Sequence, residues 1–578
     1  MGFFSCIKLF ATLLIGLLIA NWILTSYLLD FKRDISKLAL NQQSNTSSVR
    51  NENETAIYRN FLAPQGFPLT TGLGLSQGYK IRNGNFGDLW NAIMEVSSNN
   101  NNTLQFTNSN ETFSLPQING LVSNILNYQN GIFKSLGNVG IVTSISSLQG
   151  FTIMLASMVK TITSINSGIP SLLPSVPRKK IENLDVLVID SSESLKLLNG
   201  SEHWYKLVIV CEDKDNENIT PFENVVFWKQ LSHNYSNICN FEYIVPEDNS
   251  DDKKEFLNVT SQSDKTTNFS QMNLISSVAA FIKNFPMNHE LSKDDFLTIL
   301  LPNEKLQNDS NLLIQMWPKL LAILLHGGSI ALIKSKGGFE KNMGIPLKTT
   351  LLLTDKDIIN QQLSYLSQTE KQSTRLCSLF HKIKSSWAKT LISEGIFTKC
   401  GTSPNQQIPR LRCIFLSDSL HSIENISSFK MYSLPKLTYG SYMDSFTTKQ
   451  LNYMKSIFGA RIVIELYCPN LVLGPIMQTN FYEYRVLPES VDNKLVCFGT
   501  LSTTLEGKLV ETELSTLNIN KKQGMLCIRG FTIGKPVEEE RKEIARNLSK
   551  DFGGNEGWMP LVGVFGLWGQ DGCFYIFK

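Results

Sequence analysis

The sequence predicts an α/β fold with largely parallel sheets, preceded by one N-terminal membrane helix. Two observations predict it. Short β-branched runs alternate with segments at helical spacing along most of the chain, and one run of 21 residues near the N-terminus carries no charge. Among the 578 residues, 54 Lys+Arg nearly balance 51 Asp+Glu. This balance excludes a protein that binds nucleic acid through bulk positive charge, so no nucleic-acid partner is expected.

The uncharged run extends from Leu9 to Leu29 and follows a short tail, residues 1–8. As a helix it would be ~32 Å long, about the thickness of a bilayer core, and it lacks the small-residue cleavage site of a signal peptide. We therefore expect residues 9–29 to form a retained membrane anchor. A buried core helix and a hairpin in a phospholipid monolayer are the alternatives.

The flanking charges predict the side of the membrane on which the body lies. Three basic residues follow the run, namely Lys32, Arg33 and Lys37, whereas only Lys8 and the terminal amine precede it. The positive-inside rule then places the main body in the cytosol. Twelve N-x-S/T sequons leave open a lumenal glycoprotein that acts as an interaction module. Endoglycosidase treatment would distinguish the two topologies.

Two polar stretches are expected to lie outside the regular elements. Residues 30–54 have the composition of a linker that lifts the body off the membrane, and the Asn-rich stretch 97–110 has that of a surface loop. Beyond them, helices are expected at Leu148–Val159 and Leu312–Leu325. Strands are expected at Val139–Val142, Leu184–Ile189, Leu207–Val210, Asn224–Phe227, Phe296–Leu301, Ser329–Ile333, Thr349–Leu353, Arg412–Leu416 and Arg461–Leu466.

Common catalytic and metal-binding motifs are missing from the sequence. There is no H-E-x-x-H, G-x-S-x-G, Walker A or G-x-G-x-x-G stretch, the six His do not cluster, and the ten Cys include no C-x-x-C pair. Spacing alone therefore predicts no catalytic residue, no metal site and no cofactor.

The order of six local patterns carries the interpretation further. The segment 294–332 is similar to the stretch of fatty acyl-CoA synthetases that reads D-x-x-L-x-x-L-P-L-x-H, an apolar helix and L-x-x-G-x-x-x-V. The two strongest matches are QGMLCIRGFTIGKP to G-E-L-C-I-R-G and GWMPLVGVFGLWGQDGCFYIF to G-W-x-x-T-G-D-I-G-x-W-x-x-D-G-x-x-Y-I. Three further segments match in the same order, namely Val139–Thr161, Leu411–Phe429 and Phe458–Pro469.

Residues 55–578 thus resemble the long-chain fatty acyl-CoA synthetase branch of the adenylate-forming, or AMP-binding, superfamily. The resemblance implies the N-terminal domain of such an enzyme, with two parallel αβαβα subdomains and a small β subdomain. It also implies that the C-terminal lid domain is absent, because the sequence ends at Lys578. The family's apolar acyl tunnel would have the helix Leu312–Leu325 and the strand after Gly328 as walls.

The family's phosphate loop, T-S-G-T-T-G-x-P-K-G, is degenerate in this chain. The corresponding stretch keeps Thr260 and Ser261, has Lys265 as its one basic residue, and contains no glycine. Backbone N–H groups that cradle a phosphate need glycine, because a Cβ would block the approach. We therefore expect this loop not to hold a triphosphate.

The adenine and metal motif Y-G-x-T-E and the ribose motif T-G-D are altered as well. Tyr467 matches the family, but Asn470 and Leu471 replace the last two motif residues, and leucine cannot coordinate Mg²⁺. Val564 replaces the ribose-binding aspartate. The retained family positions are interpreted as residues that keep the fold, namely Gly524, Arg529, Gly530, Asp571 and Gly572.

The resemblance and its failures together predict a membrane-anchored, catalytically inactive acyl-CoA-synthetase-like protein. It would act as a scaffold in lipid metabolism or as a sensor of fatty acid or acyl-CoA, on the endoplasmic reticulum membrane or a lipid droplet. Its expected partners are the membrane, through residues 9–29, a fatty acid or acyl-CoA, and other enzymes of lipid metabolism. A divergent but active fatty acid–CoA ligase is the main alternative.

Overall fold

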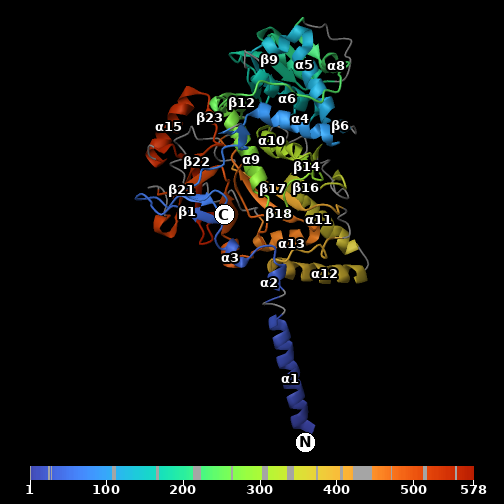
Figure 1. Ribbon diagram of the computed structural model, residues 1–578, viewed down its shortest axis with the longest axis vertical. Helices are drawn as coiled ribbons and strands as arrows, with labels where there is room; N and C mark the ends of the chain where they lie inside the picture. The colour runs from blue at the N-terminus through green and yellow to red at the C-terminus, as the bar shows by residue number, and fades with distance from the viewer. Residues whose placement is uncertain are drawn as a thin grey trace.

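Figure 1 shows the computed structural model as an elongated body with one helix standing apart from it. The structure describes residues 2–23, 27, 29–77, 79–106, 112–163, 168–212, 223–261, 264–301, 310–334, 344–372, 375–403, 408–420, 446–469, 471–511, 517–553 and 556–577. Among these residues the helices are α1 Gly2–Ile23, α2 Leu29–Lys32, α3 Lys37–Leu40, α4 Phe86–Asn99, α5 Leu115–Ser135, α6 Leu148–Thr163, α7 Ser192–Leu198, α8 Trp228–Ser232, α9 Gln271–Lys283, α10 Ser310–Leu325, α11 Lys356–Gln372, α12 Arg375–Ser393, α13 Thr448–Phe458, α14 Glu489–Asp492 and α15 Glu539–Gly553.

The strands of the same residues form two large sheets and one small one. They are β1 Ser44–Thr46, β2 Tyr58–Asn60, β3 Leu75–Gln77, β4 Lys80–Arg82, β5 Thr103–Phe106, β6 Thr112–Ser114, β7 Asn138–Ile141, β8 Pro170–Leu172, β9 Leu184–Ile189, β10 Leu207–Val210, β11 Val225–Phe227, β12 Glu255–Thr260, β13 Thr266–Ser270, β14 Phe296–Leu301, β15 Ser329–Lys334, β16 Leu351–Asp355, β17 Cys413–Ser419, β18 Arg461–Tyr467, β19 Pro475–Gln478, β20 Leu495–Leu501, β21 Leu505–Val510, β22 Gln523–Gly530, β23 Lys535–Pro536, β24 Met559–Trp568 and β25 Phe574–Phe577.

The sheets confirm the expected α/β fold. One sheet runs β11-β10-β9-β7-β8-β12-β13-β23, and its β7–β11 part is parallel. The larger sheet contains a parallel part, β5-β15-β14-β16-β17-β18, which continues through β19 into the antiparallel strands β20–β22, β24 and β25. Two parallel αβ layers and an antiparallel portion are therefore present, as the resemblance implied.

Two parallel strands of the larger sheet are buried along their whole length. All six residues of β14 and all seven of β18 are buried. Strands covered on both faces are continuous apolar runs, and the predicted strand at Phe296–Leu301 has the bounds of β14 for this reason. The helix expected at Leu148–Val159 is confirmed as α6, and the one at Leu312–Leu325 as α10.

Capping side chains fix the starts of the helices beside the candidate site. The Ser270 hydroxyl accepts a hydrogen bond from the Asn273 N–H, and the Asn273 side chain accepts one from the Ser270 N–H, which starts α9. Helix α13 ends at Phe458 and is capped by the next residue, Gly459, at φ +60°. The chain then enters β18 at Arg461.

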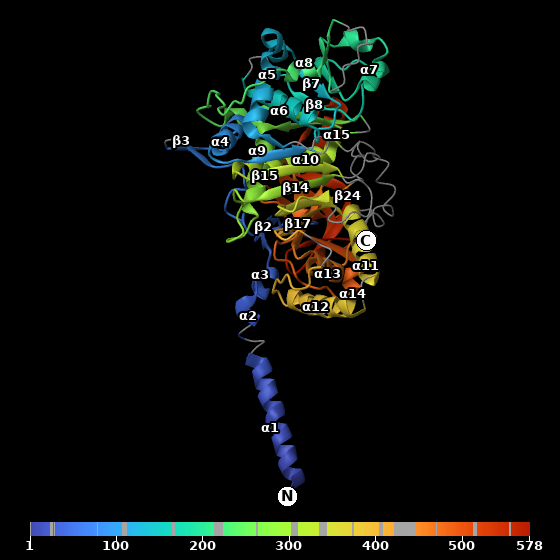
Figure 2. The same cartoon turned by 90° about the vertical axis from the view of Figure 1, so that its right-hand side faces the viewer.

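Helix α1 projects from one end of the body in both views (Figures 1 and 2). Its side chains from Phe10 to Ile23 are exposed. In the described part of the chain, no helix is both long enough and apolar enough to cross a membrane.

The segment 30–54, expected to be a polar linker, is instead part of the folded body. Strand β1 pairs antiparallel with β2, and the Gln43 N–H donates to the carbonyl oxygen of Asp571 at 2.8 Å. Ion pairs with the body at Glu394 and Arg461 hold the segment, and its polar composition does not reveal such partners. In the same way, part of the stretch 97–110 is not a loop, because β5 lies within it.

Candidate functional site

The counterpart of the phosphate loop is a closed hairpin between β12 and β13. Thr260 ends β12, and its hydroxyl lies 3.0 Å from that of Thr266. The Ser261 N–H donates to the Lys265 carbonyl at 2.8 Å, and the Asp264 N–H donates to the Ser261 carbonyl at 3.1 Å. These N–H groups are therefore directed into the hairpin itself.

A carboxylate lies against strand β13 of this hairpin. Glu538 accepts a hydrogen bond from the Thr266 N–H at 2.6 Å. Arg541 donates to the Thr266 carbonyl at 2.8 Å and forms an ion pair with Glu538 at 2.7 Å. A phosphate bound at this hairpin would therefore lie near the Glu538 carboxylate, and the guanidinium of Arg541 already forms an ion pair with that carboxylate.

Tyr467, the retained residue of the adenine and metal motif, belongs to a buried polar cluster. Its hydroxyl donates to Glu465 Oε2 at 2.7 Å and accepts from Lys319 Nζ at 2.6 Å. Lys319 Nζ and Glu465 Oε1 are 3.0 Å apart. Each of the three residues is at most 1 % exposed. Lys319 comes from α10, and Glu465 and Tyr467 come from β18, so the cluster joins helix to sheet.

Burial controls the protonation of this cluster. Desolvation lowers the pKa of Lys319, and the neighbouring carboxylate of Glu465 opposes that shift. Burial, and then the charge and hydrogen bond of Glu465, raise the pKa of Tyr467 well above its usual value. The phenol consequently stays protonated and keeps donating to Glu465. The tyrosine that the motif would present to a nucleotide is thus committed to the protein interior.

The other altered motif positions are sealed in apolar packing. Leu471 and Val564, which is a residue of β24, are each 3 % exposed and belong to the same hydrophobic cluster. Asn470 lies outside the described residues. Leu471 and Val564 therefore lie in one core, whereas Tyr467 lies with Lys319 beside Phe281 and Phe415, which belong to another. Thr260, Ser261 and Lys265 lie in the hairpin of the other sheet.

The expected walls of the acyl tunnel pack directly on their neighbours. Between α10, β14, β15 and α6 there is a void of about 10 Å³, and Phe151 stacks on Trp317 at 5.0 Å between ring centroids. Ligand pockets are typically some ~300–1,000 Å³. The void between these elements is far smaller than such a pocket.

The retained family residues occupy structural positions. Arg529 forms ion pairs with Glu506 at 2.6 Å and Glu556 at 3.6 Å, which holds β22 against β21. Gly572 lies in the turn before β25 at φ +76°, and a Cβ there would lie 2.8 Å from the Cβ and N atoms of Ser44. These contacts support the interpretation that such residues keep the fold.

Substituting Gly572 by alanine tests that interpretation. We expect the free energy of unfolding to fall by about 1–3 kcal/mol, because the new methyl group collides with Ser44 of β1. Gly66→Ala is the matched control, since Gly66 has φ +87° with open space around its Cβ position. Urea denaturation would reveal equal losses in the two variants if Gly572 had no packing role.

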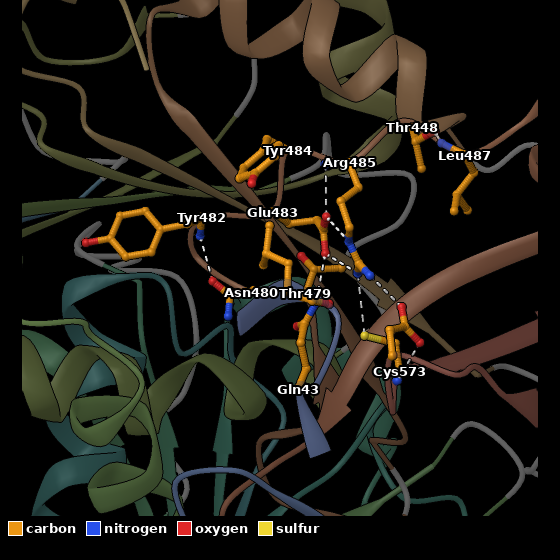
Figure 3. A network of polar contacts seen from close by, with 12 residues as sticks. Gln43, Thr448, Thr479, Asn480, Tyr482, Glu483, Tyr484, Arg485, Leu487 and Cys573 are labelled. Atoms are coloured by element: carbon orange, nitrogen blue, oxygen red, sulfur yellow. Dashed lines mark hydrogen bonds and ion pairs between the residues drawn. The ribbon is translucent and has the colours of Figure 1, made fainter. Parts of the chain in front are cut away.

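A second polar network, missed from the sequence, joins the N-terminal segment to the antiparallel strands (Figure 3). Arg485 forms ion pairs with Glu483 at 2.6 Å and with Asp571 at 2.7 Å. The Gln43 amide donates to Glu483 at 3.2 Å, and the Tyr575 hydroxyl donates to Asp571 at 2.7 Å. Asp571 and Tyr575 belong to the last of the family matches, but no motif marks Gln43, Glu483 or Arg485, so the sequence did not reveal that these residues form one network.

An open cleft of about 950 Å³ lies beside the hairpin. Its walls are the segment 173–184 and strands β12, β13 and β23. The cations that line it outnumber its three carboxylates, Glu182, Glu255 and Asp264, and are Arg178, Lys179, Lys180, Lys535 and Lys542. Within the described residues, no group of three or more His, Cys, Asp or Glu is arranged to hold a metal ion.

Comparison with solved structures defines the class of fold. The luciferase-like enzyme of the nonluminescent mealworm Zophobas morio is 13% identical with a TM-score of 0.52, over 88% of this chain and 98% of that one. Apo MatB of Rhodopseudomonas palustris is 12% identical with a TM-score of 0.54, over 85% of this chain and 78% of that one. The N-terminal domain of FACL13 of Mycobacterium tuberculosis is 9% identical with a TM-score of 0.50, over 85% of this chain and 99% of that one. The fold is that of adenylate-forming enzymes.

At the level of sequence, no protein-family model matches the chain. The chain is 50% identical over 576 residues to YHR045W, an uncharacterized protein of Saccharomyces cerevisiae, with 99% of each chain covered. It belongs to the family of that protein.

Proposed function

We propose that this protein is a catalytically inactive relative of long-chain fatty acyl-CoA synthetases that acts as a scaffold at a lipid membrane. The observation that carries the proposal is the buried cluster of Lys319, Glu465 and Tyr467, because it commits the retained motif tyrosine to the protein core. The closed hairpin at Thr260 and the buried side chain of Leu471 support it. A scaffold keeps an enzyme fold while its chemistry is lost, and fold alone does not imply activity.

Attachment to the membrane is proposed through residues 9–29. These residues carry no charge, helix α1 stands apart from the body (Figure 1), and its side chains from Phe10 to Ile23 are exposed. The lysines and arginine after the run favour a cytosolic body, on the endoplasmic reticulum or on a lipid droplet. Other enzymes of lipid metabolism on that membrane are the proposed partners.

Calorimetry on the full-length protein in detergent tests the loss of nucleotide binding. We expect Mg·ATP to give no saturable heat, with an active fatty acyl-CoA synthetase as the positive control. Saturable, Mg²⁺-dependent binding of ATP would contradict the proposal and would favour a divergent fatty acid–CoA ligase.

A second candidate function, sensing of acyl-CoA, is favoured by the cleft beside the hairpin. Its excess of lysine and arginine suits a phosphorylated ligand, and its volume is large enough for one. The packed walls at α10 disfavour the free fatty acid as ligand. Titration of the same sample with acyl-CoA separates the two functions, since a pure scaffold gives no heat with either ligand.

A further inference from the structure

One face of helix α12 is both apolar and exposed. The exposed fractions are 56% for Leu379, 66% for Phe380, 59% for Ile383 and 61% for Trp387. Their spacing of three and four residues places them on one side of the helix. Contiguous exposed apolar faces mark interaction sites. We call these four residues the α12 face.

The opposite side of α12 is buried in the body. Ser385, Ala388 and Ile392 are between 0% and 6% exposed, and α12 packs against α13. The α12 face is therefore the outer side of a firmly packed helix.

Helix α12 lies at the end of the body from which α1 projects, as both views show (Figures 1 and 2). Arg33 and Lys37 each form an ion pair at 3.1 Å with Glu394, the residue after α12. The Asp34 N–H donates to the Gly395 carbonyl at 3.0 Å. The chain that leaves α1 is thus fixed to the C-terminal end of α12, and a surface that receives α1 would lie close to α12.

The charge on α12 suits an anionic lipid surface. The helix sequence contains Arg375, Lys382, Lys384 and Lys389 and no Asp or Glu. Lys382 and Lys384 are exposed next to Ile383. Trp, Phe and Leu on one face with lysine beside them are typical of a helix that lies in the headgroup region of a membrane.

We propose that the α12 face rests in the headgroup–acyl boundary of an anionic phospholipid surface, beside the point where α1 enters it. This second contact fixes the orientation of the body relative to the membrane, which α1 alone would leave free to rotate. The inference rests on the proposed membrane attachment. A protein partner or a second copy of the chain on the α12 face would be a different occupant, and the experiment below separates these outcomes.

Two tryptophans allow the two contacts to be measured independently. Trp22 of α1 is 59% exposed and Trp387 is 61% exposed, whereas Trp90, Trp228, Trp317, Trp558 and Trp568 are buried. The full-length protein is reconstituted into phosphatidylcholine–phosphatidylserine vesicles with plain or brominated acyl chains, since bromine quenches tryptophan in contact with lipid. Trp22→Phe reports on Trp387, Trp387→Phe reports on Trp22, and the double variant gives the background.

We expect brominated lipid to quench the Trp22→Phe variant clearly more than the double variant. Adding Ile383→Glu to Trp22→Phe should reduce that difference several-fold. The matched control is Leu197→Glu, because Leu197 of α7 is 71% exposed at the opposite end of the body (Figure 2). That control should leave the quenching unchanged. Both glutamates replace exposed residues, so the thermal unfolding midpoint should stay that of the parent variant.

Quenching of Trp387→Phe without quenching of Trp22→Phe would overturn the inference and leave the attachment through residues 9–29 intact. If, in addition, Ile383→Glu dissociated an oligomer or a protein complex, the α12 face would be a protein interface. Absence of quenching in both single variants would overturn the attachment as well.

Discussion

Replacing Lys319 by methionine is expected to lower the free energy of unfolding by about 3–5 kcal/mol. The substitution keeps most of the side-chain volume but leaves Glu465 as an uncompensated charge at 0% exposure. The Tyr467 hydroxyl then faces that carboxylate without the cation that balances it. Urea denaturation of the full-length protein in detergent, followed by circular dichroism, measures the loss.

The matched double variant, Lys319→Met with Glu465→Gln, separates charge from packing. With both charges removed, the loss should be less than half of that in the single variant, because no buried ion remains unpaired. Equal losses in the two variants, or a single variant within about 0.5 kcal/mol of wild type, would show that the ion pair is not what holds α10 to β18.

Replacing Arg485 by methionine is expected to cost about 2–4 kcal/mol at neutral pH, because Glu483 and Asp571 both lose their cation. Burial acts to raise the pKa of Glu483, but the hydrogen bond and charge of Arg485 outweigh it, so the net shift is downward. A carboxylate with a depressed folded-state pKa stabilises the fold above its unfolded pKa of about 4.3. That stabilisation is lost as the pH falls through the folded-state value.

The pH dependence is therefore the signature of this network. The difference in stability between wild type and Arg485→Met should be largest near neutral pH and should shrink below about pH 4, where protonation removes the charge of Glu483. Thermal unfolding midpoints measured across this range check the prediction, with Lys449→Met as control, since Lys449 pairs with Glu489 on the surface. A difference in unfolding midpoint between wild type and Arg485→Met that stays constant with pH would contradict the assignment of the ion pair to Arg485 and Glu483.

Much of the fold could be predicted because parallel strands are locally encoded. LDVLVI and FLTILL are buried runs whose bounds in the sequence are those of β9 and β14. The docking of the N-terminal segment could not be predicted, because Asp34 meets Arg461 and Arg33 meets Glu394 across more than 350 positions of sequence. Composition reports on how polar a segment is, and it carries no information about distant partners.

The family motifs pointed to several positions of the candidate site, whose role stays a prediction, and they did not reveal the buried polar partners of Tyr467. The resemblance identified Tyr467, Leu471 and Val564 as altered or isolated family positions, and the structure shows all three buried. The sequence does contain a signal for the partners of Tyr467. Lys319 is the one charge in the apolar stretch WPKLLAILL, and Glu465 lies inside the strand sequence RIVIELY. Because buried charges need partners, one charge of each sign in two apolar stretches indicates that these two residues pair with each other.

Fatty-acid-dependent exchange of labelled pyrophosphate into ATP tests the central claim most directly, since this exchange requires formation of an acyl-adenylate. The full-length protein in detergent or vesicles is assayed with long-chain fatty acids and Mg²⁺, beside an active synthetase. We predict no exchange above the level seen without protein. Exchange that depends on both the fatty acid and the protein would show that the chain activates fatty acids, and the assignment as an inactive relative would be wrong.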